Sequence, residues 1–331
     1  MKNLLLVCCF LICSRLACSQ SILSPIVSVS FTVAQDGSGN YKTIQEAVNS
    51  FRDHMQVRVT LYIKNGTYAE KLVIPSWKPN IHITGQSRDG VIITGADYSG
   101  KAYPGGRDGT GNDKFSTYTS YTVRVDAPDI ILENITIRNT AGRVGQAVAL
   151  HVEGDRFICK NCTLLGNQDT LFAAAEGSRQ YYENCFVEGT TDFIFGKSTA
   201  VFKSCTIKSL TDSYITAAAT PAYQRYGFVF FDCNLIADPS VKKAYLGRPW
   251  RPYAQTIFIR TDVGSHILPE GWDNWDNAAN EKTVLYAEFT STGAGGDVSK
   301  RVGWSKQLTA NEASRYTLAN IFSAQSVWLP K

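Results

Sequence analysis

The chain has 331 residues, of which 44% are hydrophobic and 19% charged, and its formal net charge is +4. This composition is typical of a globular protein and excludes an intrinsically disordered, collagenous or coiled-coil chain. The charge is too small and too scattered to form a basic stripe, so nothing favours nucleic acid as a partner.

The N-terminal segment has the features of a secretory signal peptide. Lys2 precedes an apolar run over residues 4–13, and the small residues Ala17 and Ser19 follow it. A basic start, an apolar core and small residues in this order are typical of a leader that is removed on export. We therefore expect residues 1–19 to be cleaved off and the protein to be secreted, to the extracellular space or the periplasm. No later segment is long and apolar enough to span a membrane.

The cysteines fall into two groups. Four lie in the expected leader: Cys8, Cys9, Cys13 and Cys18. Five lie beyond it: Cys159, Cys162, Cys185, Cys205 and Cys233. Cys18 offers the alternative of a lipid-anchored N-terminus, which Arg15 disfavours. The odd number of remaining cysteines implies at least one free thiol unless a pair forms between molecules. Cys159 and Cys162 have the Cys-x-x-Cys spacing of a metal site, but the absence of a second Cys/His pair disfavours zinc.

The first elements after the leader are one helix and several short strands. Residues 41–51 carry apolar side chains at helical spacing (Ile44, Ala47, Val48 and Phe51), which predicts a short helix. Short β-rich runs follow at residues 73–74, 81–83 and 91–93.

An internal repeat organises the middle of the chain. Five similar segments are centred on Ile135, Cys162, Cys185, Cys205 and Cys233, which lie 27, 23, 20 and 28 positions apart. Further β-rich runs lie between them, at residues 147–150, 180–182, 193–195, 200–202 and 213–215. A period in the twenties indicates a solenoid. Three short strands and three turns fill such a period, which predicts an all-β protein folded as a parallel β-helix.

This architecture assigns the rest of the chain to one domain, residues 20–331. The five central residues should form a buried ladder, in which a free cysteine behaves as a small hydrophobic residue. The helix at 41–51 should cap the N-terminal end of the solenoid, since terminal repeats need a cover. The last clear coil is at residues 255–259, and we expect residues 271–331 to pack outside as loops and short helices.

The repeat also stacks polar residues. Asp169 and Asp192 each lie seven positions after a ladder residue, so they should be neighbours one coil apart, at about 4.8 Å. Gln146 and Gln168 should occupy the same face. Two carboxylates this close cannot both ionise freely, so one can act as an acid and the other as a nucleophile or base, while the amides can donate to an oxyanion. The alternative is that these residues only cap turns. The same offset also selects Asp212.

Other chemistries find little support in the sequence. No Gly-x-Ser-x-Gly motif, phosphate loop or dinucleotide fingerprint is present. The four histidines are scattered without the spacing of metal ligands. We therefore expect no metal and no cofactor.

Several motifs resemble those of the pectin methylesterase (pectinesterase) family. They occur in the family's order at residues 33–41, 66–75, 146–150 (QAVAL), 166–171 (GNQDTL), 189–196 (GTTDFIFG), 246–250 (LGRPW) and 269–272. The resemblance covers roughly residues 31–310. It implies a right-handed parallel β-helix that removes methyl esters from galacturonan.

The resemblance also implies roles for five catalytic residues. Asp192 resembles the nucleophile, and Asp169 resembles the acid that protonates the departing methanol and then the base that activates water. Gln146 and Gln168 resemble the oxyanion-stabilising pair. Arg248 resembles the residue that holds the nucleophilic carboxylate. Asp212 matches no catalytic position.

Four further positions are implied to contact substrate. Trp250 resembles a wall of the sugar cleft, and Phe195 matches an aromatic residue within it. Phe172 stands where many members have tyrosine, which removes a hydroxyl from the cleft. Thr122 belongs to a segment, residues 117–122, that resembles a substrate-contacting strand.

The leading hypothesis is a secreted, monomeric ester hydrolase. It would act on methyl-esterified homogalacturonan and release methanol and pectate. One alternative is a β-helix glycoside hydrolase that cleaves galacturonan, because paired carboxylates also cleave glycosidic bonds. Others are a non-catalytic polysaccharide-binding protein and a thioester hydrolase on the same scaffold.

Overall fold

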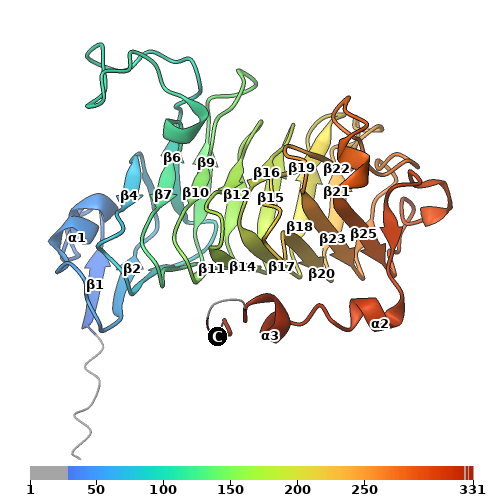
Figure 1. Cartoon of the computed structure of the whole chain (residues 1–331). Helices are drawn as coiled ribbons and strands as arrows, with labels where there is room; N and C mark the ends of the chain where they lie inside the picture. Colours follow the sequence, from blue (N-terminus) through green and yellow to red (C-terminus); the bar gives the residue numbers. More distant parts are fainter. Residues whose placement is uncertain (1–28, 324–325, 327, 331) are drawn as a thin grey trace, which may run out of the picture.

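Short strands joined by turns wind into a right-handed parallel β-helix (Figure 1). The computed structural model describes residues 29–323, 326 and 328–330. The expected leader, residues 1–19, and the candidate lipidation site Cys18 lie outside these residues. The strands form three sheets of 11, 8 and 7 strands, in which strands one coil apart pair in parallel. The predicted fold class is therefore confirmed.

Each coil contributes strands to the three sheets in turn. The 11-stranded sheet contains β1 (Val29–Val33), β2 (Val59–Ile63), β5 (Ile81–Gly85), β8 (Ile131–Glu133), β11 (Phe157–Lys160), β14 (Arg179–Glu183), β17 (Thr199–Lys203), β20 (Phe228–Phe231), β23 (Gln255–Ile259), β25 (Leu285–Phe289) and β26 (Lys306–Gln307). The 8-stranded sheet contains β3 (Gly66–Tyr68), β6 (Val91–Gly95), β9 (Thr136–Asn139), β12 (Thr163–Leu165), β15 (Phe186–Gly189), β18 (Thr206–Ser209), β21 (Asn234–Ala237) and β24 (Asp262–Val263). The 7-stranded sheet contains β4 (Leu72–Ile74), β7 (Val123–Val125), β10 (Leu150–Val152), β13 (Leu171–Ala173), β16 (Ile194–Gly196), β19 (Tyr214–Ala218) and β22 (Tyr245–Pro249).

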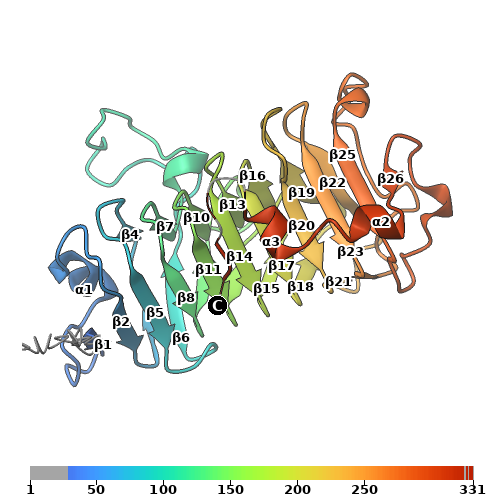
Figure 2. The same cartoon turned by 60° about the horizontal axis from the view of Figure 1, so that its bottom comes forward.

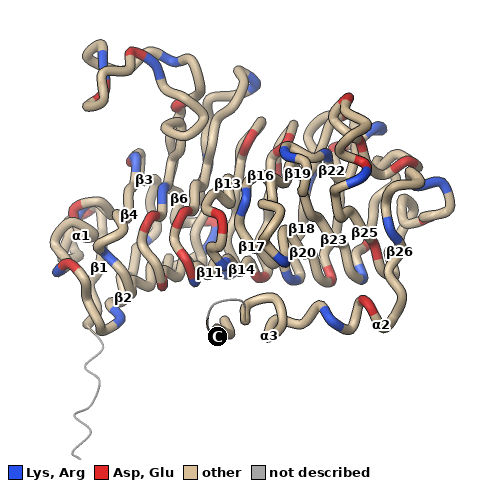
Figure 3. The backbone as a smooth tube through the Cα atoms, viewed as in Figure 1, with Lys and Arg blue, Asp and Glu red and all other residues tan. Residues whose placement is uncertain are grey.

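The helices are short and lie outside the coils. They are α1 (Ile44–Ser50), η1 (Thr117–Thr119), η2 (Asn280–Lys282), η3 (Val298–Lys300), α2 (Ala310–Ala313) and α3 (Leu318–Ile321), where η marks a 3-10 helix. No helix in the described part of the chain is long and apolar enough to cross a membrane. Basic and acidic residues are interspersed along the solenoid (Figure 3).

A residue in the left-handed backbone conformation precedes each ladder residue and accounts for the repeat in the sequence. The residue just before each ladder position has a positive φ of 49–54° in Asn134, Asn161, Asn184, Ser204 and Asp232. Asparagine and aspartate tolerate this conformation better than most residues, and it turns the chain from the 11-stranded into the 8-stranded sheet. The ladder residues that follow are all at most 2% exposed: Ile135, Cys162, Cys185, Cys205 and Cys233. Their expected burial is confirmed.

Aromatic rings form a second column inside the solenoid. Tyr182, Phe202, Phe230 and Phe258 occupy equivalent positions on successive strands of the 11-stranded sheet. Their ring centroids lie 4.7, 4.5 and 4.4 Å apart, and the rings are stacked. Because equivalent residues of neighbouring coils are spaced by one strand separation, flat side chains at this position stack directly. This column fills the core beneath the sheets.

The predicted helix at residues 41–51 is present as α1. The Thr43 side chain caps it by accepting the backbone N–H of Glu46, and Ile44, Ala47 and Val48 are buried. The helix lies at the N-terminal end of the solenoid in Figure 1.

The C-terminal region differs in part from the expectation. Helices α2 and α3 run along the outside of the 11-stranded sheet, as expected (Figures 1 and 2). However, Leu285–Phe289 forms β25 and pairs with β23, so the coil at 255–259 is not the last one. The sequence does not indicate this strand clearly, because the charged residue Glu288 interrupts its apolar pattern. That carboxylate is fully buried and forms an ion pair with Arg301 at 2.7 Å.

One strand boundary also differs. The strand expected at residues 147–150 begins only at Leu150. The residues before it are nonetheless tied to the next coil, since Ala147 N–H donates to the Gln168 carbonyl oxygen and Ala149 N–H to that of Thr170. This extended approach to β10 carries Gln146.

Candidate active site

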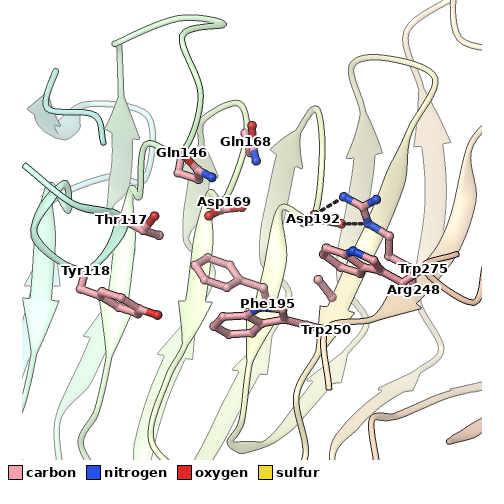
Figure 4. Close-up of a pocket in the computed structure, with 11 residues that line it drawn as sticks. Thr117, Tyr118, Gln146, Gln168, Asp169, Asp192, Phe195, Arg248, Trp250 and Trp275 are labelled. Atoms are coloured by element: carbon pink, nitrogen blue, oxygen red, sulfur yellow. Dashed lines mark hydrogen bonds and ion pairs between the residues drawn. The ribbon is translucent and has the colours of Figure 1, made fainter. Parts of the chain in front are cut away.

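A pocket on the outer side of the 7-stranded sheet collects most of the residues that the sequence selects (Figure 4). Its lining consists of Thr117, Tyr118, Gln146, Gln168, Asp169, Asp192, Phe195, Ala217, Arg248, Trp250 and Trp275. The structure thus brings together all five candidate catalytic residues and two of the four candidate substrate contacts.

The two aspartates lie opposite each other on neighbouring coils. Leu171 pairs with Ile194, which places Asp169 and Asp192, two residues earlier in each strand, in register. Both have a positive φ, 67° and 49°, and are only 7% and 6% exposed. The expected stacking of the two carboxylates is therefore confirmed.

Asp212 does not join the pair. Ile194 pairs with Thr216, so Tyr214, not Asp212, stands opposite Asp192. The coil after Cys205 contains two more residues before its strand, which moves Asp212 outward. There its carboxylate accepts the backbone N–H groups of Lys242 and Lys243 at 2.7 and 2.8 Å.

Arg248 binds the Asp192 carboxylate with two hydrogen bonds. From β22, its Nε donates to Oδ1 of Asp192 at 2.9 Å and its Nη2 to Oδ2 at 2.7 Å (Figure 4). The guanidinium carbon also lies 3.9 Å from the ring centroid of Tyr214 and 3.7 Å from that of Trp275. A planar guanidinium suits both a carboxylate and aromatic faces, so its orientation is fixed from several sides.

The environment separates the two carboxyl groups in acidity. Burial raises the pKa of Asp169 well above its ordinary value, and the nearby charge of Asp192 raises it further. Burial also raises the pKa of Asp192, but the hydrogen bonds and charge of Arg248 act in the opposite direction. The pKa of Asp169 is therefore raised more strongly than that of Asp192, which suits Asp169 to the role of an acid and Asp192 to that of its ionised partner.

Two neutral amides accompany the carboxyl groups. Gln146 and Gln168 form an isolated parallel bridge between neighbouring coils. Figure 4 shows both side chains on the same side of Asp169. Their amide N–H groups can donate to a developing negative charge without adding a charge of their own.

Aromatic rings form the wall and floor of the cleft. Phe195 stacks on Phe172 with centroids 4.4 Å apart and planes 5° from parallel, and Trp250 meets Phe195 edge-on at 5.9 Å. Phe172 lies in an adjoining hollow, which it lines together with Tyr118, Trp250 and others. Flat apolar faces of this kind suit a sugar ring.

Thr122 does not reach the cleft. It is 1% exposed, and its hydroxyl donates to the Arg138 carbonyl oxygen at 3.0 Å. Thr122 is therefore not part of the pocket lining. Thr117 and Tyr118 of the same segment line the pocket instead, because η1 lifts them over the cleft.

Trp275 was not identified from the sequence. It lies outside the repeat, in the stretch expected to form outer loops, and no periodicity places it. Its backbone N–H donates to the carboxylate of Asp273 at 2.7 Å, and its φ is 61°. A tight turn thus brings its ring over Arg248.

The described residues contain no group of three or more His, Cys, Asp or Glu side chains arranged to hold a metal ion. Acid–base and nucleophilic chemistry on the carboxyl pair is what the geometry supports. Two buried carboxyl groups with unequally raised pKa values, neutral amide donors and an aromatic cleft are components that an acyl-transfer reaction can use.

Comparisons with known proteins agree with this geometry. A family model described as Pectinesterase matches residues 30–325. A probable pectinesterase/pectinesterase inhibitor from Brassica napus is 38% identical over 303 residues, which cover 87% of this chain and 50% of that protein. Pectinesterase 4 from Arabidopsis thaliana is 36% identical over 309 residues, covering 89% and 50%. The chain spans about half the length of these curated relatives.

Solved structures are similar over nearly their whole length. Pectin methylesterase from carrot superposes with a TM-score of 0.80 at 33% identity, covering 90% of this chain and 94% of that one. Pectin methylesterase PemA from Erwinia chrysanthemi gives a TM-score of 0.77 at 30% identity, covering 93% and 100%.

Proposed function

The chain belongs to the pectinesterase family, and on this basis we propose that it is a secreted pectin methylesterase. It hydrolyses the methyl esters of homogalacturonan to methanol and pectate, with residues 20–331 acting as one catalytic domain after removal of residues 1–19. The observation that supports this most directly is the buried carboxyl pair, with Arg248 bound to one member only.

Asp192 is the proposed nucleophile. Its ionised carboxylate attacks the ester carbonyl carbon, and the carbonyl oxygen becomes an oxyanion that accepts N–H donors from Gln146 and Gln168. Arg248 lowers the pKa of Asp192 against the effect of burial and so favours its ionised form, and it orients the attacking oxygen. As the tetrahedral intermediate collapses, Asp169 donates its proton to the methoxy oxygen, which leaves as methanol.

The second half of the reaction uses the same residues. The sugar carboxyl carbon is now joined to an oxygen of Asp192 as an anhydride. Asp169, which has lost its proton, takes a proton from water as the water attacks this carbon. The bond to Asp192 breaks and restores its carboxylate, the galacturonic acid product is released and loses its remaining proton to solvent, and Asp169 is again protonated.

The aromatic cleft binds the polymer. Trp250 and Phe195 pack against sugar rings beside the carboxyl pair, a role that their position in the pocket lining supports. Phe172 extends this surface into the adjoining hollow, without the hydroxyl that a tyrosine would bring.

A direct assay tests the proposed activity. Purified wild-type protein should release methanol from highly methylated pectin. It should form no new reducing ends on demethylated polygalacturonate, because the Gln pair and Arg248 serve an acyl oxyanion and a nucleophilic carboxylate. Formation of reducing ends without methanol would instead support a glycoside hydrolase. If neither product forms, the remaining alternatives are a polysaccharide-binding protein and a thioester hydrolase.

Loss of the Trp275 ring should change kcat more than it changes KM. Trp275→Ala removes an aromatic face from Arg248 and should reduce kcat for methanol release by about 5- to 30-fold, the range of a partly desolvated cation–π contact. Trp77→Ala is the matched control, since Trp77 is 47% exposed and lies outside the pocket. Equal kcat values for the two variants would show that Trp275 does not orient Arg248.

A further inference from the structure

The segment between β6 and β7 leaves the solenoid and returns beside the cleft. After Gly95 the chain forms a long loop that projects from the coils in Figure 1, and it rejoins them at Val123. Near its end, η1 carries Thr117 and Tyr118 to the pocket. Within the described residues η1 takes part in no strand pairing; on its C-terminal side Ser120 is bound to the neighbouring coil, where its hydroxyl oxygen accepts the Val148 N–H at 3.2 Å.

Lys71 contacts both ends of this loop. It lies in the turn between β3 and β4, and its Nζ donates to the Asp97 carboxylate at 2.8 Å, where the loop begins. The same Nζ donates to the carbonyl oxygens of Thr119 at 2.7 Å and Tyr121 at 3.0 Å, where the loop ends. An ammonium group has three N–H donors, so these contacts use all of them.

Aromatic rings complete the surroundings of the ammonium group. Lys71 Nζ lies 4.7 Å from the ring centroid of Phe115 and 4.4 Å from that of Tyr121. Both rings belong to the returning part of the loop. A lysine charge over aromatic faces, with charge-assisted hydrogen bonds to carbonyl groups, holds more firmly than neutral contacts would.

The tethered segment presents Tyr118 to the substrate side. Tyr118 is 51% exposed, and its ring centroid lies 5.7 Å from that of Phe172, over the aromatic floor. Lys71 is not among the residues that line the pocket. Lys71 therefore acts on the cleft indirectly, through the end of the loop that carries η1 and Tyr121.

We infer that Lys71 is a positioning residue that sets the height of Tyr118 over the cleft and thereby the affinity for the pectin polymer. This inference rests on the proposed function. It assigns to Lys71 a role in KM and none in the chemical step, because the carboxyl pair lies on other coils.

Lys101 provides a matched control. It also binds Asp97, at 2.8 Å, but its other hydrogen bond is to the Ala96 carbonyl oxygen at 3.1 Å. Both of its partners lie where the loop begins. Lys101→Met therefore removes a lysine from the same cluster without releasing η1.

The test is a double-mutant cycle on methylated pectin. Lys71→Met should raise KM about 5- to 10-fold, the scale of one lost aromatic contact, with kcat within about twofold of wild type. Tyr118→Ala should produce the same rise. In the double variant KM should equal that of Tyr118→Ala alone, because the two residues act through one contact. Lys101→Met should leave KM unchanged.

A second substitution at Lys71 keeps the test informative if Lys71→Met does not fold. Lys71→Gln keeps a polar side chain and should raise KM in the same way, and thermal melts of each variant establish that it is folded. An unchanged KM in the folded Lys71 variants, or KM increases that multiply in the double variant, would overturn the inference. Absence of methanol release by the wild type would overturn the proposed function instead.

Discussion

Asp192→Asn should lower kcat for methanol release by about 10⁴-fold or more, the order seen when a catalytic nucleophile is removed. Asparagine has nearly the same shape, and its amide oxygen can still accept from Arg248. It has no negative charge with which to attack the ester carbon. The loss should appear in kcat, with the KM for pectin little changed, since the aromatic cleft remains intact.

Asp212→Asn is the control for this prediction. Asp212 lies at the same offset from its ladder cysteine as Asp192, but it is exposed and binds only the backbone of Lys242 and Lys243. Its substitution should leave kcat unchanged. Substantial methanol release by Asp192→Asn, measured on protein with a wild-type circular dichroism spectrum, would contradict the covalent mechanism.

Asp169→Asn should lower kcat strongly and at the same time stabilise the protein at neutral pH. Asp169 supplies the proton for the departing methanol and later receives one from water, and a general acid–base group contributes about 10²- to 10⁴-fold in rate. kcat should fall by that factor. The stability gain has a separate cause in the burial of the carboxyl group.

The pH dependence of that gain follows from the raised pKa. A carboxyl group whose pKa is raised in the folded state binds its proton more tightly there than in the unfolded chain. The free energy of unfolding therefore falls as pH rises above the unfolded value, about 3.9, and continues to fall until the folded-state pKa is passed. Asparagine does not ionise, so Asp169→Asn avoids this loss.

Thermal unfolding measures the effect. The melting temperature of Asp169→Asn should exceed that of the wild type at pH 7, and the difference should vanish in acid below the unfolded pKa, where both proteins are neutral at this position. A lower melting temperature at pH 7 would show that the Asp169 carboxylate is stabilised by its surroundings, and the assignment of the proton to this residue would then be wrong.

The parts of the site that follow from the repeat were predictable. Strand pairing places equivalent residues of successive coils side by side, so a spacing in the sequence becomes a distance in the molecule. For that reason the ladder of Cys162 and Cys185, and the opposition of Asp169 and Asp192, could be inferred without the structure. Asp212 shows the limit of this rule, because two extra residues in one turn break the correspondence.

The parts that come from outside the repeat were not predictable from spacing. Arg248 was selected by resemblance, and only the structure shows its two hydrogen bonds to Asp192. Trp275 and Tyr118 reach the cleft from irregular segments, and β25 was hidden by a buried Glu288.

Sequence alone therefore determined the solenoid, its buried ladder and the stacked carboxyl pair. All three depend on contacts one coil apart, which the hydrogen-bonded ladder of a parallel sheet makes periodic. The tertiary structure decided which aspartate is paired with arginine, which aromatic rings surround the cleft, and how Lys71 holds the loop that carries Tyr118. These contacts join loops and coils that lie far apart in the sequence, where no period relates position to distance.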